Sequence, residues 1–245
     1  MADERSPGGS RIYRHEHPAH AAEQRISGGD PELIDAIDEH LDRCFGEDDR
    51  WVFHELVSPT IHLDVHRVPP TESFPFQRLV TSGMAEAPMT VPEGLGETPF
   101  AELTIALPAD WPMSQEAFAD ERVYWPIRVL KDLARLPHEY STFLRYGHTI
   151  PNGNPPAPYA DGTGLCCAFV APPVAAPDEF AEMLVGDGGS VRILAVVPLY
   201  EDEMRLKLER GADALYDLFD EHGITDVVDP TRPSIAPRRR RFFGR

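Results

Sequence analysis

Apolar side chains first recur at a helical spacing just after residue 30. Asp30 stands where a helix N-cap belongs, and Pro31 suits the first helical position because that position needs no amide hydrogen. One apolar stripe follows, made of Ile34, Ile37, Leu41 and Phe45. Gly46 is a typical helix-ending residue, so the pattern predicts a helix over residues 31–45 with an acidic outer face.

The next hundred residues change to short apolar or alternating runs, and proline and glycine mark the turns between them. An antiparallel meander is the simplest arrangement. Because strand side chains alternate, His62, Asp64 and His66 point to the opposite side from their apolar neighbours. The predicted strands are residues 50–56, 61–68, 76–82 and 101–107.

Helical spacing returns after residue 113. Ser114 predicts a helical turn, and a longer helix is predicted over residues 124–140, where Pro126 is tolerated within the first turn. Residues 146–163 are so rich in proline and glycine that they predict a long loop. Loops of this length in compact domains are usually functional or disordered. The buried stripe of the longer helix is Ile127, Leu130, Leu133 and Ala134.

Two apolar runs and a last helix complete the pattern. Residues 165–171 and 191–200 predict strands, and the second is apolar enough to be central. A helix is predicted over residues 201–222, ended by Gly223, and residues 224–228 predict a final strand. No apolar stretch reaches the length of a membrane-spanning helix.

Both ends of the chain lack an apolar pattern. Residues 1–29 predict a mobile arm, so the domain is expected over residues 30–230, followed by a disordered basic tail over residues 231–245. The tail is a candidate contact for nucleic acid or an acidic surface, although a solvated tail explains it better. Three histidines of the arm are metal-binding candidates, although solvated side chains explain them better: His15, His17 and His20.

The chain carries a formal charge of −18 at pH 7, and five of its 23 basic residues lie in the last eight positions. Residues 1–237 therefore hold 18 basic and 41 acidic side chains, a net charge of −23. Such a surface repels phosphate backbones, which disfavours nucleic acid and favours a basic protein partner. The alternative is that the acidity only keeps the protein soluble.

The first residues hold no apolar segment of a secretory signal, which favours a cytoplasmic protein. The three cysteines, Cys44, Cys166 and Cys167, lack the spacing of zinc or redox sites. They are expected to be buried free thiols.

The sequence holds no glycine-rich phosphate loop, no paired-histidine zinc helix and no nucleophile elbow. Its most site-like feature is the face formed by His62, Asp64 and His66, which suits a metal or a general base. Solvent-facing polar residues on a half-buried sheet explain the same pattern. A metal-dependent or hydrolytic enzyme that uses these residues or His148 is therefore the alternative hypothesis, and no cofactor or metal is expected.

Aromatic and polar side chains gather around the predicted loop of residues 146–163. Amphipathic aromatic rings beside amide groups suit the recognition of an extended peptide, although the same rings also pack a long loop onto a core. The candidate partner-binding residues are Asp64, His66, Trp125, Tyr140, Tyr146, His148, Asn152 and Tyr159, with Asn154 close by.

Four stretches resemble the Suppressor of Fused family in its short bacterial form. They are LVTSGMAEAPM (79–89), AELTIALPADWP (101–112), YWPIRVLKDLARLPHEYSTFLRYGHTIPNG (124–153) and VVPLYEDEMRLKLERGADAL (196–215). Together with the element pattern, this resemblance implies a single α+β domain with a mixed, largely antiparallel β-sheet packed with helices.

The resemblance also implies a binding protein without a known enzymatic activity. Eukaryotic members restrain a transcription factor by gripping a short segment of it, partly by strand addition. Bacterial members often look like immunity proteins of polymorphic toxin systems. The sequence lacks the large additional C-terminal region of the eukaryotic pattern, so a Hedgehog-type role is not carried over.

We therefore expect a non-enzymatic module that sequesters a partner protein, such as a basic toxin domain, and binds neither nucleic acid nor membrane through its main domain. Its groove is expected between residues 146–163 and the neighbouring strands. A structural or homo-oligomeric component is a third hypothesis.

Overall fold

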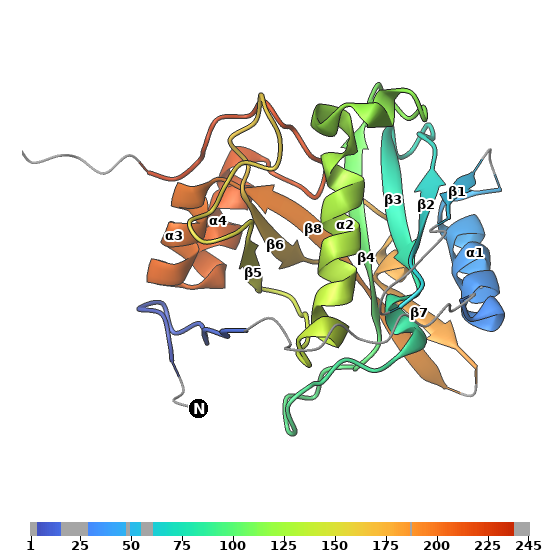
Figure 1. The fold of residues 1–245 in the computed structure, drawn as a ribbon, viewed down its shortest axis with the longest axis horizontal. Helices are drawn as coiled ribbons and strands as arrows, with labels where there is room; N and C mark the ends of the chain where they lie inside the picture. Colours follow the sequence, from blue (N-terminus) through green and yellow to red (C-terminus); the bar gives the residue numbers. More distant parts are fainter. Residues whose placement is uncertain (1–3, 16–28, 48–49, 55–60, 187, 238–245) are drawn as a thin grey trace, which may run out of the picture.

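A computed structural model describes residues 4–15, 29–47, 50–54, 61–186 and 188–237 of the chain. Within these ranges eight strands form one mixed sheet, and helices cover both of its faces (Figure 1). The strands follow the order β1-β2-β3-β4-β8-β6-β5, and β7 pairs with β8 beside this path. Their bounds are β1 Trp51–Phe53, β2 Asp64–Val68, β3 Phe76–Ser82, β4 Ala101–Pro108, β5 Thr149–Pro151, β6 Cys167–Ala171, β7 Glu182–Val185 and β8 Gly189–Leu199.

Strands β1 to β4 form the antiparallel meander that the sequence predicts. The next strand along the sheet is β8, which lies parallel to β4 with Leu103 opposite Leu194. Strand β8 then pairs antiparallel with β6, so it is central as predicted. The fold is the predicted α+β arrangement of a mixed, mostly antiparallel sheet and helices.

Helix α2 (Glu121–Glu139) covers one face of the sheet. The Asp120 side chain caps it by accepting a hydrogen bond from the Arg122 amide. Pro126 therefore lies in the second turn and not in the first, because the helix begins before the predicted start. Leu130 and Leu133 of the predicted stripe pack into the main core with side chains of the strands, among them Leu79, Leu103, Ile105, Leu194 and Val196.

Adjacent residues of one strand reach different cores because strand side chains alternate. Leu79 packs toward α2, whereas Val80 packs into a second core under α1 (Pro31–Phe45), the predicted and capped helix. In β6, Ala168 belongs to the α2 core and Phe169 to a third core. That third core lies under α3 (Glu201–Arg210) and α4 (Ala212–His222), at the opposite end of the sheet from α1 (Figure 1).

Three predicted elements differ from the structure. The helix over residues 201–222 is broken in two, because Gly211 takes a backbone φ of 95° between α3 and α4. The loop over residues 146–163 contains the short strand β5. Residues 224–228 make only one bridge, between Val227 and Ala106. The helical turn predicted at Ser114 is present as the 3-10 helix Ala117–Ala119, and the described residues contain two further 3-10 helices, Met84–Glu86 and Asp178–Ala181.

The described parts of both ends lie against the body. The Gly8 amide donates to the Leu208 carbonyl at 2.8 Å, so residues 4–15, assigned above to a mobile arm, follow α3. Near the other end Arg232 pairs with Glu203, and Ile235 is buried, so residues 231–237 also have contacts. The predicted domain boundaries themselves stay a prediction. His17, His20 and the arginine-rich last residues lie outside the described ranges. No helix in the described ranges is both long and apolar enough to cross a membrane.

Candidate functional site

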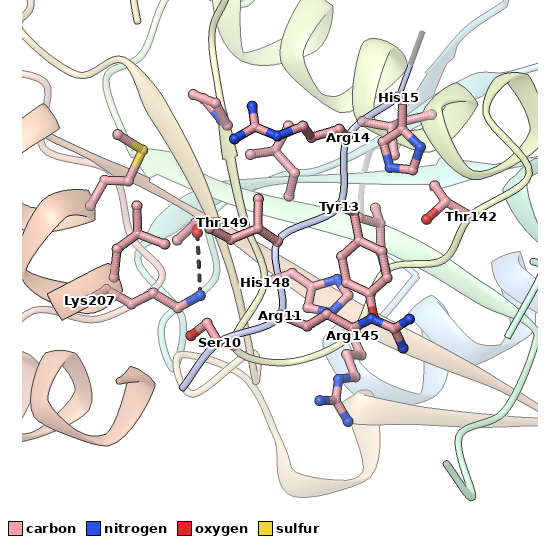
Figure 2. Close-up of a pocket in the computed structure, with 18 of the residues that line it drawn as sticks. Ser10, Arg11, Tyr13, Arg14, His15, Thr142, Arg145, His148, Thr149 and Lys207 are labelled. Carbon is pink, nitrogen blue, oxygen red and sulfur yellow. Dashed lines mark hydrogen bonds between the residues drawn. The ribbon is translucent and has the colours of Figure 1, made fainter. Parts of the chain in front are cut away.

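A cavity of about 540 Å³ lies beside β5, at the end of the sheet. Most of its lining comes from three segments: residues 10–15 near the N-terminus, residues 142–156 around β5, and α3 (Figure 2). Leu136 of α2 and Ala212, the first residue after α3 and Gly211, complete it. We call this cavity the β5 pocket. Its apolar lining includes Ile12, Leu136, Phe143, Leu144, Ile150, Met204 and Leu208. A volume of this size and a mostly apolar lining are typical of sites that take a small molecule or a few side chains.

The outer edge of β5 borders the pocket. Strand β5 is last in the strand order, and among the described residues its only strand partner is β6, with Ile150 opposite Ala168. Both Thr149 and Pro151 line the pocket. Within the described residues no second strand pairs with this edge, and Pro151 has no amide hydrogen to donate.

Aromatic rings hold the N-terminal segment over one side of the pocket. The Tyr13 ring centroid lies 5.7 Å from that of Phe143 and 5.8 Å from that of His148. The rings of Phe143 and His148 are themselves 5.1 Å apart. This cluster makes residues 10–15 a wall of the site, and Figure 2 shows Tyr13 and His148 side by side.

The pocket lining contains basic groups but no Asp or Glu. Lys207 of α3 is only 4% exposed, and its ammonium lies 3.3 Å from the Thr149 hydroxyl oxygen. Burial lowers the pKa of Lys207. Burial, followed by the positive charges of Arg145 and Lys207, lowers the pKa of His148 to about 4, so this imidazole is neutral at pH 7.

The structure brings four of the predicted partner-binding residues to this region. Tyr146 and His148 line the pocket, and the Tyr140 ring lies 5.4 Å from that of the pocket residue His15. Asn152 lies next to the pocket, where its side-chain amide donates to the Ala157 carbonyl at 2.7 Å and holds the loop after β5.

Trp125 and Tyr159 lie in the core and not on the surface. Their rings stack at a centroid distance of 5.2 Å, and the two residues are 1% and 6% exposed. Burial raises the pKa of the Tyr159 hydroxyl. Both rings pack the loop after β5 onto α2, so neither is open to a partner.

The expectation that His62, Asp64 and His66 face solvent is wrong. Asp64 and His66 are 3% and 1% exposed, and helix α1 lies against the face of β2 that holds His66. The His66 ring contacts Asp38 of α1 at 3.1 Å and the Ser82 hydroxyl at 2.9 Å.

Asp64 instead joins two other imidazoles. It lies 3.0 Å from His54 and 3.1 Å from His62. These contacts lie near β2, whereas His148 lies beside β5 at the other end of the strand order, so the residues of the alternative enzyme hypothesis do not form one cluster. In the described part of the chain no group of three or more His, Cys, Asp or Glu side chains is arranged to hold a metal ion.

Two parts of the pocket could not be predicted from the sequence, namely residues 10–15 and Lys207. Residues 10–15 carry no apolar period, and only their packing onto Phe143 makes them a wall. In the sequence, Lys207 looks like an ordinary solvent-facing residue of an amphipathic helix. Its one visible signal is rarity, because the chain contains only two lysines, Lys131 and Lys207.

Comparisons with known proteins agree on one family. The family model of the Suppressor of fused protein matches residues 59–233. A suppressor of fused homologue from Neisseria gonorrhoeae superposes with a TM-score of 0.60 at 19% identity, covering 84% of this chain and 98% of that one. A chain of the Sufu–Fu complex gives 0.60 at 14% identity, covering 84% and 93%.

Drosophila Suppressor of Fused gives a TM-score of 0.61 at 15% identity, covering 84% of this chain and 51% of the fly chain. At these identities the solved structures show a shared fold, whereas the family model matches the sequence itself. No match was found among curated proteins. Since the family model spans well over half of the chain, the chain belongs to the suppressor of fused protein family.

Proposed function

We propose that this chain is a non-enzymatic protein-binding module that holds an extended segment of a partner in the β5 pocket. The observation that carries the proposal is the position of the pocket. A cavity of about 540 Å³ with a mostly apolar lining lies along the last strand of the sheet, where a peptide would find both main-chain groups and a place for side chains.

Side chains rather than a long ladder would supply most of the contact. Strand β5 has only three residues, and Pro151 offers no amide hydrogen. A partner segment would therefore gain few main-chain hydrogen bonds here. Specificity would come from the side chains that it places against Phe143, Ile150 and Leu208.

The family supports the binding class, and the finer role is part of the proposal. One similar structure is a Sufu–Fu complex, so that protein assembles with another. For this chain we propose a cytoplasmic immunity or regulatory protein that sequesters its partner. Its formal charge of −18 suits a partner with a basic body, such as a toxin domain.

Capture of the partner by the full-length chain tests the proposal. The tagged protein is expressed in its native cells, or together with the products of neighbouring genes, and the retained proteins are quantified. We expect one partner in a stoichiometric amount. Tyr146→Ala should weaken its binding by about 2 kcal/mol or more if Tyr146 is an anchor residue of the interface.

Leu184→Ala is the matched control, because Leu184 is a 77% exposed apolar residue on β7, away from the pocket. This variant should retain the partner as the wild type does. The binding function fails if no stoichiometric partner is found, and its assignment to the pocket fails if a folded Tyr146→Ala variant binds normally.

A further inference from the structure

One buried ammonium group lies among the polar side chains of the β5 pocket. Figure 2 shows the Lys207 side chain reaching from α3 toward Thr149, whose hydroxyl is 3.3 Å from the ammonium nitrogen. Lys207 is 4% exposed and lies in the pocket lining. Elsewhere the chain uses arginine for almost every positive charge, since it contains 21 Arg and only two Lys.

Lys207 has no counter-ion among the described residues. It forms no ion pair there, and its pKa is lowered chiefly by burial. Two other basic residues of the lining have acidic partners: Arg14 lies 2.8 Å from Glu4, and Arg145 lies 3.8 Å from Glu97. A buried charge without a partner is costly, whereas a paired one is tolerated.

The lining also determines the charge and shape that would complete the site. The one buried ammonium matches one negative charge, as a carboxylate carries. The Thr149 hydroxyl is able to donate a hydrogen bond to the same anion. Around these groups the walls are apolar, with Phe143, Met204 and Leu208 among them.

We propose that the β5 pocket binds a carboxylate carried on an apolar body, with Lys207 as its counter-ion. The carboxylate belongs either to a free organic acid or to an acidic side chain of a bound polypeptide. Only the second source rests on the proposed function. There, the partner's segment places an acidic residue, flanked by apolar residues, in the pocket.

Because the chain has two lysines, NMR of full-length protein labelled with carbon-13 at lysine Cε gives one signal for each, assigned with Lys131→Arg. The probes are octanoate and the peptide N-acetyl-Leu-Glu-Leu-amide. A bound carboxylate favours the charged lysine, so the titration midpoint of Lys207 should rise while that of Lys131 stays constant.

Binding of the same probes to Lys207→Met measures how much the positive charge of Lys207 contributes to their affinity. Methionine has an unbranched side chain of similar length without the ammonium. Thermal unfolding checks that the variant folds. Binding of the effective probe should weaken about tenfold or more, as expected when a charge-assisted hydrogen bond is lost. Lys131→Met is the control and should bind as the wild type does.

Octanoate binding alone assigns the site to a free acid, and peptide binding that is lost with Gln in place of Glu assigns it to a polypeptide. The proposal is overturned if neither probe shifts the Lys207 signal, or if folded Lys207→Met binds as tightly as the wild type. Partner capture by folded Lys207→Met at the wild-type level would leave the proposed function standing while removing the polypeptide source.

Discussion

Two buried arginines near the C-terminal segment are each paired with a buried carboxylate. Arg78 lies 3.2 Å from Asp226, and both side chains are almost fully enclosed. Arg232 donates to Glu203 at 2.8 Å. Because removing one member of a buried pair is strongly destabilising, these pairs fix the segment after α4 to strand β3 and to helix α3. Lys207 differs from both arginines, because it is buried without a carboxylate partner among the described residues.

The neutral state of His148 should make the free energy of unfolding depend on pH. Its pKa is about 4 in the folded protein and about 6.5 when exposed, so the unfolded chain binds the proton more readily between these values. The contribution of neutral His148 is therefore complete above pH 6.5 and is lost as pH falls toward 4. Between pH 7 and pH 5 we expect it to remove about 2 kcal/mol of the free energy of unfolding.

Urea unfolding at both pH values, on the wild type and on His148→Gln, checks this expectation. Many carboxylates titrate in the same range, so the informative quantity is the difference between the two proteins. His148→Gln should lose less stability on acidification, whereas His222→Gln, at an exposed position, should behave as the wild type does. Equal losses in wild type and His148→Gln would contradict the assignment.

At the scale of elements, the N-terminal segment is held to the break between α3 and α4 through a glycine contact. A Cβ on Gly8 would lie 2.4 Å from the Gly211 nitrogen and 2.8 Å from that of Arg210, closer than side-chain atoms pack. Gly8→Ala should therefore release residues 4–15 from α3. We expect hydrogen exchange at the Gly8 position and its neighbours to accelerate about tenfold or more, with little change in the sheet.

Gly9→Ala is the control, since a Cβ there meets nothing within 4 Å and costs only the strain of a positive φ. It should loosen the segment less than Gly8→Ala does. If the two variants exchange alike, the close contact with Gly211 does not hold the segment.

Elements whose signals are local could be predicted from the sequence. Helix α1 has its cap at Asp30 and its own apolar stripe, and the meander strands alternate or carry apolar runs. Features that depend on distant residues could not be predicted. The face of β2 that holds His66 looks solvent-exposed until α1 lies against it, and β5 is hidden in a proline-rich loop until β6 pairs with it.

The candidate site shows the same division. Tyr146 and His148 could be predicted because aromatic residues gather in one loop, yet the same pattern includes Tyr159, which the core absorbs. Composition cannot separate the two outcomes, because burial depends on which ring stacks on Trp125. The wall formed by residues 10–15 depends on tertiary contact alone.

At the scale of the whole molecule, the net charge of the chain is negative, whereas the charged side chains that line the β5 pocket are positive. The chain as a whole carries −18, whereas the β5 pocket is lined by basic groups without a carboxylate. Long-range attraction and local recognition therefore favour different parts of a partner. Taken with the two proposals, this describes a partner with a basic body that inserts an apolar segment carrying one acidic residue.

The long-range part predicts a salt dependence of association. The field of the acidic surface extends about 10 Å at 0.1 M salt and about 3 Å at 1 M, so added salt should slow the encounter with a basic partner. Dissociation should change much less, because buried contacts in the pocket are screened weakly. Stopped-flow or surface-based kinetics with the captured partner measures both rates across this range.

A charge variant separates steering from general salt effects. Asp35→Asn with Glu39→Gln removes two exposed charges from the outer face of α1, far from the pocket. The variant should associate more slowly than the wild type at low salt and equally fast at high salt, with an unchanged dissociation rate. An association rate that is the same at low and high salt would show that the acidic surface does not steer the partner, and would leave recognition to the pocket alone.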